Sequence, residues 1–230
     1  KAFLTIAMCK IIEREGLCLD VVSGGELYTA IKADFPAERI EFNGNNKSLE
    51  ELELAIDYNI GRIIVDGFDE LDIIEDICRK KGKKTNILYR ITPGVKSDSH
   101  DYIVTGKKDS KFGFPLDDDV IFPAIEKAIN SPYVNFLGLH FHVGSQLHTN
   151  ESHLKALNIT LKLIKDLIER YDYVIKELNV GGGYGIRYTD ADDRKPYAYF
   201  LDPIMEQIEE FSKNMNITRP DVVVEPGRSI

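Results

Sequence analysis

The fold class is decided by residues 134–180, which read VNFLGLHFHVGSQLHTNESHLKALNITLKLIKDLIERYDYVIKELNV. The apolar runs at 134–143 and 175–180 are short enough to be buried strands. Between them, residues 151–171 repeat large aliphatic side chains at the spacing of an amphipathic helix. The helical stripe consists of Leu154, Leu157, Leu161, Ile164 and Ile168. A strand, a helix and a strand in this order predict one βαβ unit of a parallel sheet.

The same alternation extends along the chain. Helices are expected near residues 3–15, 24–34, 48–59, 68–82, 117–130, 151–171 and 197–214. Strands are expected at residues 19–23, 39–43, 62–66, 87–92, 134–143, 175–180 and 221–225. Ser48, with Glu51 three residues later, predicts a capping box at the start of the third helix.

Seven strands alternate with seven helices, and the first element is a helix. We therefore expect a truncated first strand at Lys1, which would bring the count to the eight strands of a TIM-type (β/α)8 barrel. A doubly wound open sheet is the alternative, but residues 22–26 lack the GxGxxG turn of that fold. Residues 1–230 are expected to form one α/β-barrel domain, and the missing initial methionine predicts a fragment of a longer protein.

The charge, the hydropathy and the cysteines of the chain limit which partners and which compartment are expected. The chain has 29 Lys and Arg against 38 Asp and Glu, a net charge of −9, which argues against binding to nucleic acid or anionic membranes. No apolar run approaches the roughly 20 residues that span a bilayer. Three cysteines without a CxxC pair predict buried free thiols in a reducing cytoplasm.

The strand at residues 134–143 carries two of the five histidines. Apolar residues alternate there with Gly138, His140 and His142, which therefore share one face. In a barrel the apolar face meets the helices, so both histidines are expected to point inward. Interior hydrogen bonding, a functional site and a metal site are the alternatives, although a HxH pair without a nearby carboxylate is weak evidence for zinc.

Two further motifs follow late strands. Gly181, Gly182 and Gly183 allow backbone N–H groups to approach an anion, and Ser145 adds a hydroxyl at a neighbouring strand end. A flexible turn is the alternative. Glu225 on the last strand requires a partner if it points inward, and Arg228 is suited to a phosphate or carboxylate. A Glu225–Arg228 salt bridge is the structural alternative.

The remaining candidates lie at or just beyond strand ends or on a polar strand face: Lys1, Asp20, Glu26 and Arg90. Long connections at 93–116 and 182–196 also follow strand ends, where barrel active sites are built. Phosphate donors, an acid for a ring nitrogen, a flat imidazole and a lysine together match the needs of pyridoxal 5'-phosphate (PLP).

These motifs resemble the PLP-dependent decarboxylases of the alanine-racemase-like fold, and within them the diaminopimelate branch. The matching segments are residues 1–3, 19–27, 43–48, 89–95, 110–114, 140–146, 179–185 and 225–228. The segment 110–114 and Gln146 favour this branch over ornithine or arginine decarboxylases. Phe141 departs from the pattern, because many relatives carry a smaller residue there.

The resemblance implies three catalytic residues. Lys1 would carry PLP covalently, His142 would stack on its ring, and Glu225 would keep the ring nitrogen protonated. Arg228 would bind either the phosphate or a substrate carboxylate, and no metal is implied. The implied cofactor-binding residues are Lys1, Asp20, Glu26, Arg90, His142, Ser145, Gly181, Gly182, Gly183, Glu225, Gly227 and Arg228.

The resemblance also implies the reaction, the decarboxylation of meso-diaminopimelate to L-lysine in lysine biosynthesis. It implies a cytoplasmic homodimer whose second, β-sheet domain is absent from this chain, so the fragment alone is expected to be inactive. Three alternatives stay open: an ornithine or arginine decarboxylase, a non-catalytic PLP-binding homologue, and a barrel lyase with a histidine-bound metal.

Overall fold

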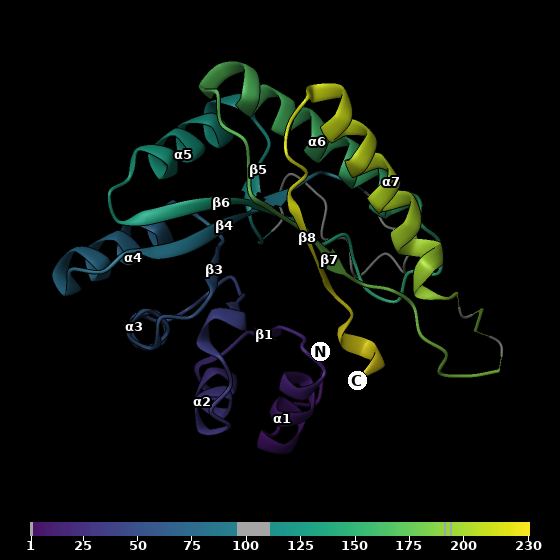
Figure 1. The fold of residues 1–230 in the computed structure, drawn as a ribbon, viewed down its shortest axis with the longest axis horizontal. Coiled ribbons are helices and arrows are strands. Elements are labelled where there is room, and N and C mark those ends of the chain that lie inside the picture. Colours follow the sequence, from purple (N-terminus) through teal and green to yellow (C-terminus); the bar gives the residue numbers. More distant parts are fainter. Residues whose placement is uncertain (1, 96–110, 191, 194) are drawn as a thin grey trace. The chain divides into compact units, whose positions relative to one another are not determined.

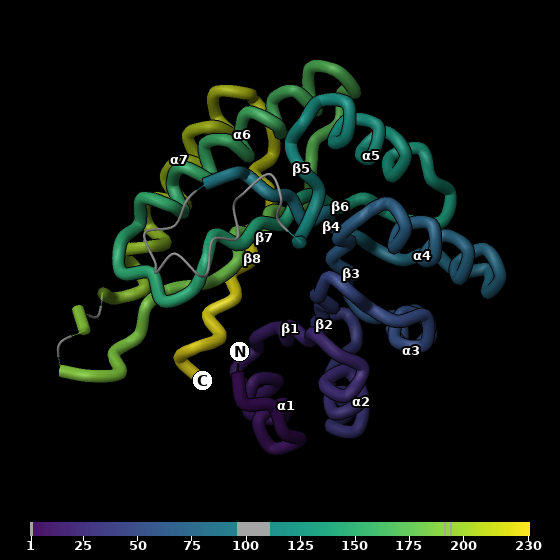
Figure 2. The backbone as a smooth tube through the Cα atoms, turned by 180° about the vertical axis from the view of Figure 1, so that it is seen from behind, coloured from purple at the N-terminus to yellow at the C-terminus, as the bar shows by residue number. Residues whose placement is uncertain are grey.

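The computed structural model describes residues 2–95, 111–190, 192–193 and 195–230, and these residues form two compact units. The N-terminal unit comprises residues 3–90 and 112–137. The C-terminal unit comprises residue 2, the described residues of 91–111, and residues 138–230. Figures 1 and 2 show the elements of both units from opposite sides.

The N-terminal unit begins with alternating helices and parallel strands. Its strands β1 (Leu19–Val21), β2 (Ile40–Phe42), β3 (Arg62–Val65) and β4 (Thr85–Thr92) pair side by side in chain order. The helices around them are α1 (Ile6–Arg14), α2 (Gly24–Lys32), α3 (Leu49–Tyr58) and α4 (Phe68–Lys81), with a 3-10 turn η1 (Ala37–Arg39) before β2. Helices α1 and α2 lie next to each other in both views (Figures 1 and 2).

The N-terminal unit ends with β5 (Phe114–Pro115), α5 (Asp118–Asn130) and the first half of β6 (Val134–His140). Strand β5 pairs with β4 and was not expected from the sequence, because two residues show no periodicity. The predicted capping box is confirmed. Ser48 Oγ accepts a hydrogen bond from Glu51 N at 3.3 Å, and Glu51 Oε2 accepts one from Ser48 N at 2.8 Å.

The C-terminal unit contains the end of β6, α6 (Glu151–Tyr171), β7 (Glu177–Gly182), α7 (Tyr197–Met215), β8 (Asp221–Glu225) and a 3-10 turn η2 (Gly227–Ser229). Strands β6, β7 and β8 are parallel neighbours, with His140 opposite Asn179 and Gly182 opposite Glu225. Helices α6 and α7 run side by side in both views (Figures 1 and 2). The helical stripe predicted for residues 151–171 is largely buried against the sheet and α7, as Leu157 and Ile164 illustrate.

The strand order over the described residues is β1-β2-β3-β4-β6-β7-β8. The predicted alternation of helices and strands is confirmed except at β5, which follows β4 with no described helix between them. The predicted strand at 134–143 is too long, because β6 ends at His140 although Phe141 N still donates to Asn179 O at 3.0 Å. The expectation of buried thiols is right for Cys9 and Cys78 and wrong for Cys18, which is exposed. No described helix is long and apolar enough to cross a membrane.

Candidate functional site

The ends of three strands in the C-terminal unit carry most of the expected site residues. Parallel strands end at a common edge, so the residues after β6, β7 and β8 come together there. His142 and Ser145 follow β6, the glycine run ends β7, and Glu225 ends β8. These three strand ends are called the strand-end cluster below.

Two polar side chains, from β6 and β7, lie against the Glu225 carboxylate. Asn179 Nδ2 donates to Glu225 Oε1 at 2.8 Å, and His140 Nε2 lies 3.1 Å from the same oxygen. Neither ring nitrogen of His140 has a hydrogen-bond partner with good geometry among the described residues, and the ring is fully buried. The carboxylate of Glu225 is therefore held by its bond to Asn179 and lies beside a buried imidazole.

The backbone packs closely around the glycine run, Gly181 to Gly183. A Cβ on Gly181 would lie 2.4 Å from Phe141 O, one on Gly182 would lie 1.9 Å from Glu225 O, and one on Gly183 would lie 2.2 Å from Gly144 O. Gly181 and Gly183 also have positive φ angles of 68° and 94°, which other residues adopt at a cost. Close packing therefore requires glycine at all three positions, a reason that the alternative of a merely flexible turn does not include.

Two histidines hold the central glycine of this run. Gly182 N donates to His142 Nδ1 at 3.3 Å, and Gly182 O lies 2.9 Å from His153 Nε2. Because His142 Nδ1 accepts, its neutral ring carries the proton on Nε2. His142 therefore lies beside the glycine run.

Arg228 is bound to a serine and a tyrosine. Its Nε donates to Ser145 Oγ at 2.7 Å, and its Nη1 donates to Tyr188 Oη at 2.6 Å. Gly227 begins the short turn η2 that carries Arg228, and Ser229 in the same turn accepts from Tyr197 Oη at 2.7 Å. These partners of Arg228 differ from the Glu225–Arg228 salt bridge that was the structural alternative.

The expected site residues of the N-terminal unit have other surroundings. Asp20 is exposed on β1. Glu26 Oε2 accepts from Val22 N at 2.7 Å, which ties the first turn of α2 to the end of β1. Arg90 is buried, with its Nε 3.9 Å from Asp66 Oδ1 and its guanidinium 4.3 Å from the centre of the Phe112 ring.

Two expected features fall outside what the structure can place. Lys1 lies outside the described residues, and so does most of the connection at 93–116. In the part of the chain that is described, no three His, Cys, Asp or Glu side chains are grouped as metal ligands would be.

Three contributing residues were not singled out from the sequence. Asn179 also accepts from Gly181 N at 2.8 Å, so it connects Glu225 to the glycine run. Tyr188 shows no sequence signal, because it lies in an irregular connection. His153 has a sequence signal, because it precedes Leu157 by one helical turn on the apolar face of α6.

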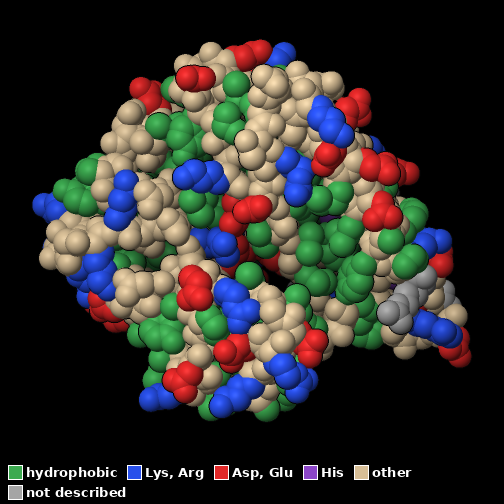
Figure 3. All heavy atoms as spheres, viewed as in Figure 1, with side chains coloured by type: hydrophobic (Ala, Val, Ile, Leu, Met, Phe, Trp, Pro, Cys, Tyr) green, Lys and Arg blue, Asp and Glu red, His purple; other side chains and the backbone are tan. Residues whose placement is uncertain are grey.

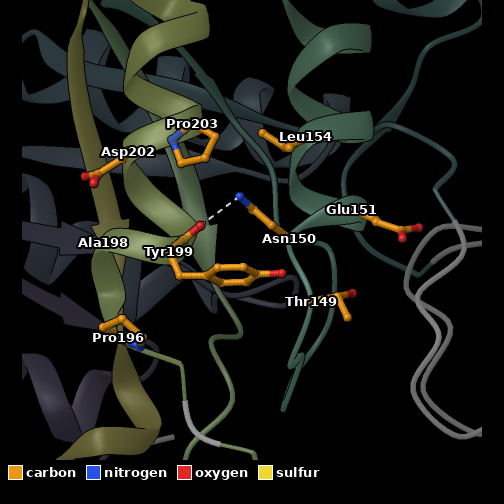
Figure 4. Close-up of a pocket in the computed structure, with 9 residues that line it drawn as sticks. All are labelled: Thr149, Asn150, Glu151, Leu154, Pro196, Ala198, Tyr199, Asp202 and Pro203. Atoms are coloured by element: carbon orange, nitrogen blue, oxygen red, sulfur yellow. Dashed lines mark hydrogen bonds between the residues drawn. The ribbon is translucent and has the colours of Figure 1, made fainter.

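An open groove lies between the starts of α6 and α7, away from the predicted residues (Figure 4). Pro203 lacks an N–H, so the carbonyl of Tyr199 four residues earlier loses its helical donor. Asn150 replaces it, because its Nδ2 donates to Tyr199 O at 3.1 Å, the bond drawn in Figure 4. Asn150 therefore has a structural role at the groove. On the face drawn in Figure 3, side chains of both charges are interspersed.

Comparison with known proteins gives consistent results. Residues 1–230 match the family described as "Pyridoxal-dependent decarboxylase, pyridoxal binding domain". The whole chain is 47% identical to the diaminopimelate decarboxylase of Bacillus methanolicus and 46% identical to that of Bacillus subtilis, and it covers 53% and 52% of those proteins. The chain therefore spans about half the length of the curated relatives that it matches.

Solved structures confirm the fold class. Diaminopimelate decarboxylase from M. jannaschi, alone or in co-complex with L-lysine, matches 98% of this chain and 51% of its own, with a TM-score of 0.88 and 33% identity. The expectation of an α/β fold of the TIM-barrel type is confirmed by this similarity.

Proposed function

Because this chain belongs to the pyridoxal-dependent decarboxylase family, as its pyridoxal-binding domain, we propose that the whole protein decarboxylates meso-diaminopimelate to L-lysine. The family match confirms the expected pyridoxal cofactor. The reaction is supported by the diaminopimelate decarboxylases that resemble the chain over its full length, one of them in complex with L-lysine. On this proposal the protein is a carboxy-lyase of lysine biosynthesis that acts in the cytoplasm as a homodimer.

The strand-end cluster is the observation that carries the proposal, because its chemistry suits this cofactor. Gly183 has no room for a Cβ, because its backbone passes close to Gly144 O and to the His142 ring, and its own amide group is therefore not covered by a side chain. The cationic Arg228 and the hydroxyl of Ser145 are joined at 2.7 Å, a pairing suited to a phosphate. The Glu225 carboxylate lies in the same unit and suits a protonated ring nitrogen. The residues therefore fit PLP at both its charged ends.

Glu225 would hold the proton on the ring nitrogen. Its carboxylate is fixed by Asn179, and the nearby Tyr184 has its pKa raised by burial first and by the charge of Glu225 second. With that proton held in place, bound PLP acts as the electron sink that the loss of CO2 requires. A carboxylate is needed here, since an amide at this position would not stabilise a positive ring.

Arg228, Ser145 and the glycine run would bind the phosphate, and His142 would orient the ring. Arg228 is half-buried and has two neutral oxygen partners, so its charge is available to an anion. We assign Arg228 to the phosphate. A substrate carboxylate is the second assignment that the sequence left open.

Lys1 would carry the cofactor, and Asp20, Glu26 and Arg90 would lie around it, as the family resemblance implies. Gly227 would begin the turn that presents Arg228. We further propose that residues 1–230 act as one cofactor-binding domain of the longer protein.

The proposal is tested on the full-length protein with PLP. Release of CO2 from meso-diaminopimelate, and retention of the cofactor on the peptide containing Lys1 after borohydride reduction, are the expected results. Turnover of ornithine or arginine instead would assign the protein to a sister branch. Binding of PLP without release of CO2 from any of these amino acids would identify a non-catalytic homologue.

A further inference from the structure

His153 is a buried polar side chain for which the proposed chemistry has no role. It lies in the first turn of α6 and has no exposed surface. Its Nε2 is 2.9 Å from Gly182 O. Its ring stacks on Tyr184 with the ring centres 5.1 Å apart and the planes 15° apart. Its Nδ1 has no hydrogen-bond partner among the described residues.

The protonation state of His153 follows from these contacts. Burial lowers its pKa, and the bond to Gly182 O opposes that only in part, so the ring is neutral at physiological pH. A neutral imidazole has one N–H, and the carbonyl oxygen of Gly182 can only accept. The proton is therefore on Nε2, and His153 donates to Gly182.

This bond fixes the peptide between Gly182 and Gly183. The chain has no cis peptide bond among the described residues, and in a trans peptide the C=O and the N–H point in opposite directions. Because Gly182 O points toward His153 on α6, the N–H of Gly183 points away from α6. Gly182 N is held in turn by His142 Nδ1, so both ends of Gly182 are restrained by imidazoles.

Gly183 is the glycine of the run that is suited to contact a ligand. Gly181 and Gly182 are buried, whereas Gly183 is partly exposed. Its carbonyl accepts from Leu147 N at 2.9 Å, and its N–H has no acceptor within the described residues. The loop that reaches Leu147 also carries Ser145, which binds Arg228.

We infer that His153 is a positioning residue for the cofactor phosphate, which it serves by fixing the Gly182–Gly183 peptide so that the Gly183 N–H is directed into the strand-end cluster. This inference rests on the proposed function, because it needs a phosphate there. His153 itself touches neither cofactor nor substrate.

The test compares two substitutions in the full-length protein. His153→Phe keeps a flat ring against Tyr184 and removes the N–H, whereas His153→Gln places an amide N–H near the position of Nε2. Equilibrium titration should show about tenfold weaker PLP binding for His153→Phe, the effect of about one hydrogen bond to a charged group. His153→Gln should bind within about twofold of the parent. The ³¹P resonance of bound PLP should move only in the Phe variant.

Pyridoxal, which lacks the phosphate, is the decisive second ligand. His153→Phe should leave the affinity for pyridoxal unchanged, because the lost contact is to the phosphate. An equal loss for pyridoxal and PLP, or an unchanged PLP affinity, would overturn the inference. His148→Phe is the matched control, because His148 bonds to Asp193 O in a nearby connection. The His148→Phe variant should bind PLP like the parent.

The test also separates this inference from the proposed function. Failure of the parent protein to bind PLP would overturn both. Binding by the parent with no difference between the Phe and Gln variants would overturn the role of His153 alone. If His153→Phe does not fold, His153→Asn replaces it, because the shorter Asn side chain does not reach Gly182 O. The Asn variant is then compared directly with His153→Gln.

Discussion

Two buried polar side chains, one in each unit, have opposite surroundings. In the N-terminal unit, Lys47 is almost fully buried and its ammonium donates to Gly44 O at 2.7 Å, Ile64 O at 2.7 Å and Glu70 Oε1 at 2.5 Å. An ammonium has three N–H groups, so all of them are used. In the C-terminal unit, His140 is equally buried but has no well-aligned partner among the described residues.

On the proposed function, this difference separates a charge that the fold uses from groups that a ligand would use. A saturated ammonium has nothing left to offer a ligand, so Lys47 is explained by the fold. The strand-end cluster keeps an imidazole, a peptide N–H and an arginine with capacity for another acceptor. Unsatisfied buried polar groups cost stability, and their presence together points to a ligand that satisfies them.

The largest expected effect is on stability in the N-terminal unit. Lys47→Met should lower the free energy of unfolding by about 3–5 kcal/mol, because it leaves the Glu70 carboxylate buried without its partner. Burial already raises the pKa of Glu70 more than Lys47 lowers it. Chemical denaturation measures the loss. Lys127→Met, which removes a partly exposed ion pair with Asp72, should cost less than about 1 kcal/mol.

The double variant Lys47→Met with Glu70→Gln sharpens this prediction. Removing the stranded charge should recover part of the lost stability, while an amide oxygen can still accept from Asp66 N. A double variant that is no more stable than Lys47→Met would show that the charge of Glu70 is not the cause.

The next effect concerns the glycine run in the C-terminal unit. Gly182→Ala should cost about 3 kcal/mol, because its Cβ would lie 1.9 Å from the backbone oxygen of Glu225 and the ends of β7 and β8 must separate. PLP binding should fall with it. Gly25→Ala on α2, whose Cβ meets only Ser23 Oγ at 3.9 Å, should change stability by less than about 1 kcal/mol. Thermal melting of both variants measures the contrast.

The sequence predicted the framework well because its signals are local. Helix α6 begins and ends at the predicted residues, since its apolar spacing and its flanking polar residues are both strong. The end of β6 was missed because alternation continues through residue 143, whereas the chain leaves the ladder after His140 to place Ser145. Periodicity records which face a side chain is on and does not record where pairing stops.

The candidate site was predictable in its residue types and not in its connections. Glycines after a strand and a carboxylate on another strand can be recognised from the sequence. The link through Asn179 between Glu225 and the glycine run depends on the register between strands, which the sequence does not encode locally. His153 was hidden for the opposite reason, because its position on an apolar helix face reads as core.

A smaller effect is expected for the arginine of the strand-end cluster. Arg228→Lys keeps the charge but loses the guanidinium donors that reach Ser145 and Tyr188. PLP should bind about 10–100-fold more weakly, with the melting temperature of the apo protein nearly unchanged because Arg228 is partly exposed. Fluorescence titration with PLP measures this. A large loss of apo stability with unchanged PLP affinity would make Arg228 a structural residue like Lys47.

The smallest expected effect is a change in the pH dependence of stability. His153 has a folded pKa below its unfolded value of about 6.5, so the unfolded chain takes up a proton first as the pH falls. The contribution of His153 is therefore fully present above pH 6.5 and is lost as the pH falls from there toward the folded pKa. Urea denaturation of the apo protein between pH 7.5 and pH 5 should show a weaker acid destabilisation in His153→Phe, whereas His148→Phe should follow the parent. Parallel curves for His153→Phe and the parent would mean that the fold does not lower the pKa of His153, and this prediction would then be wrong.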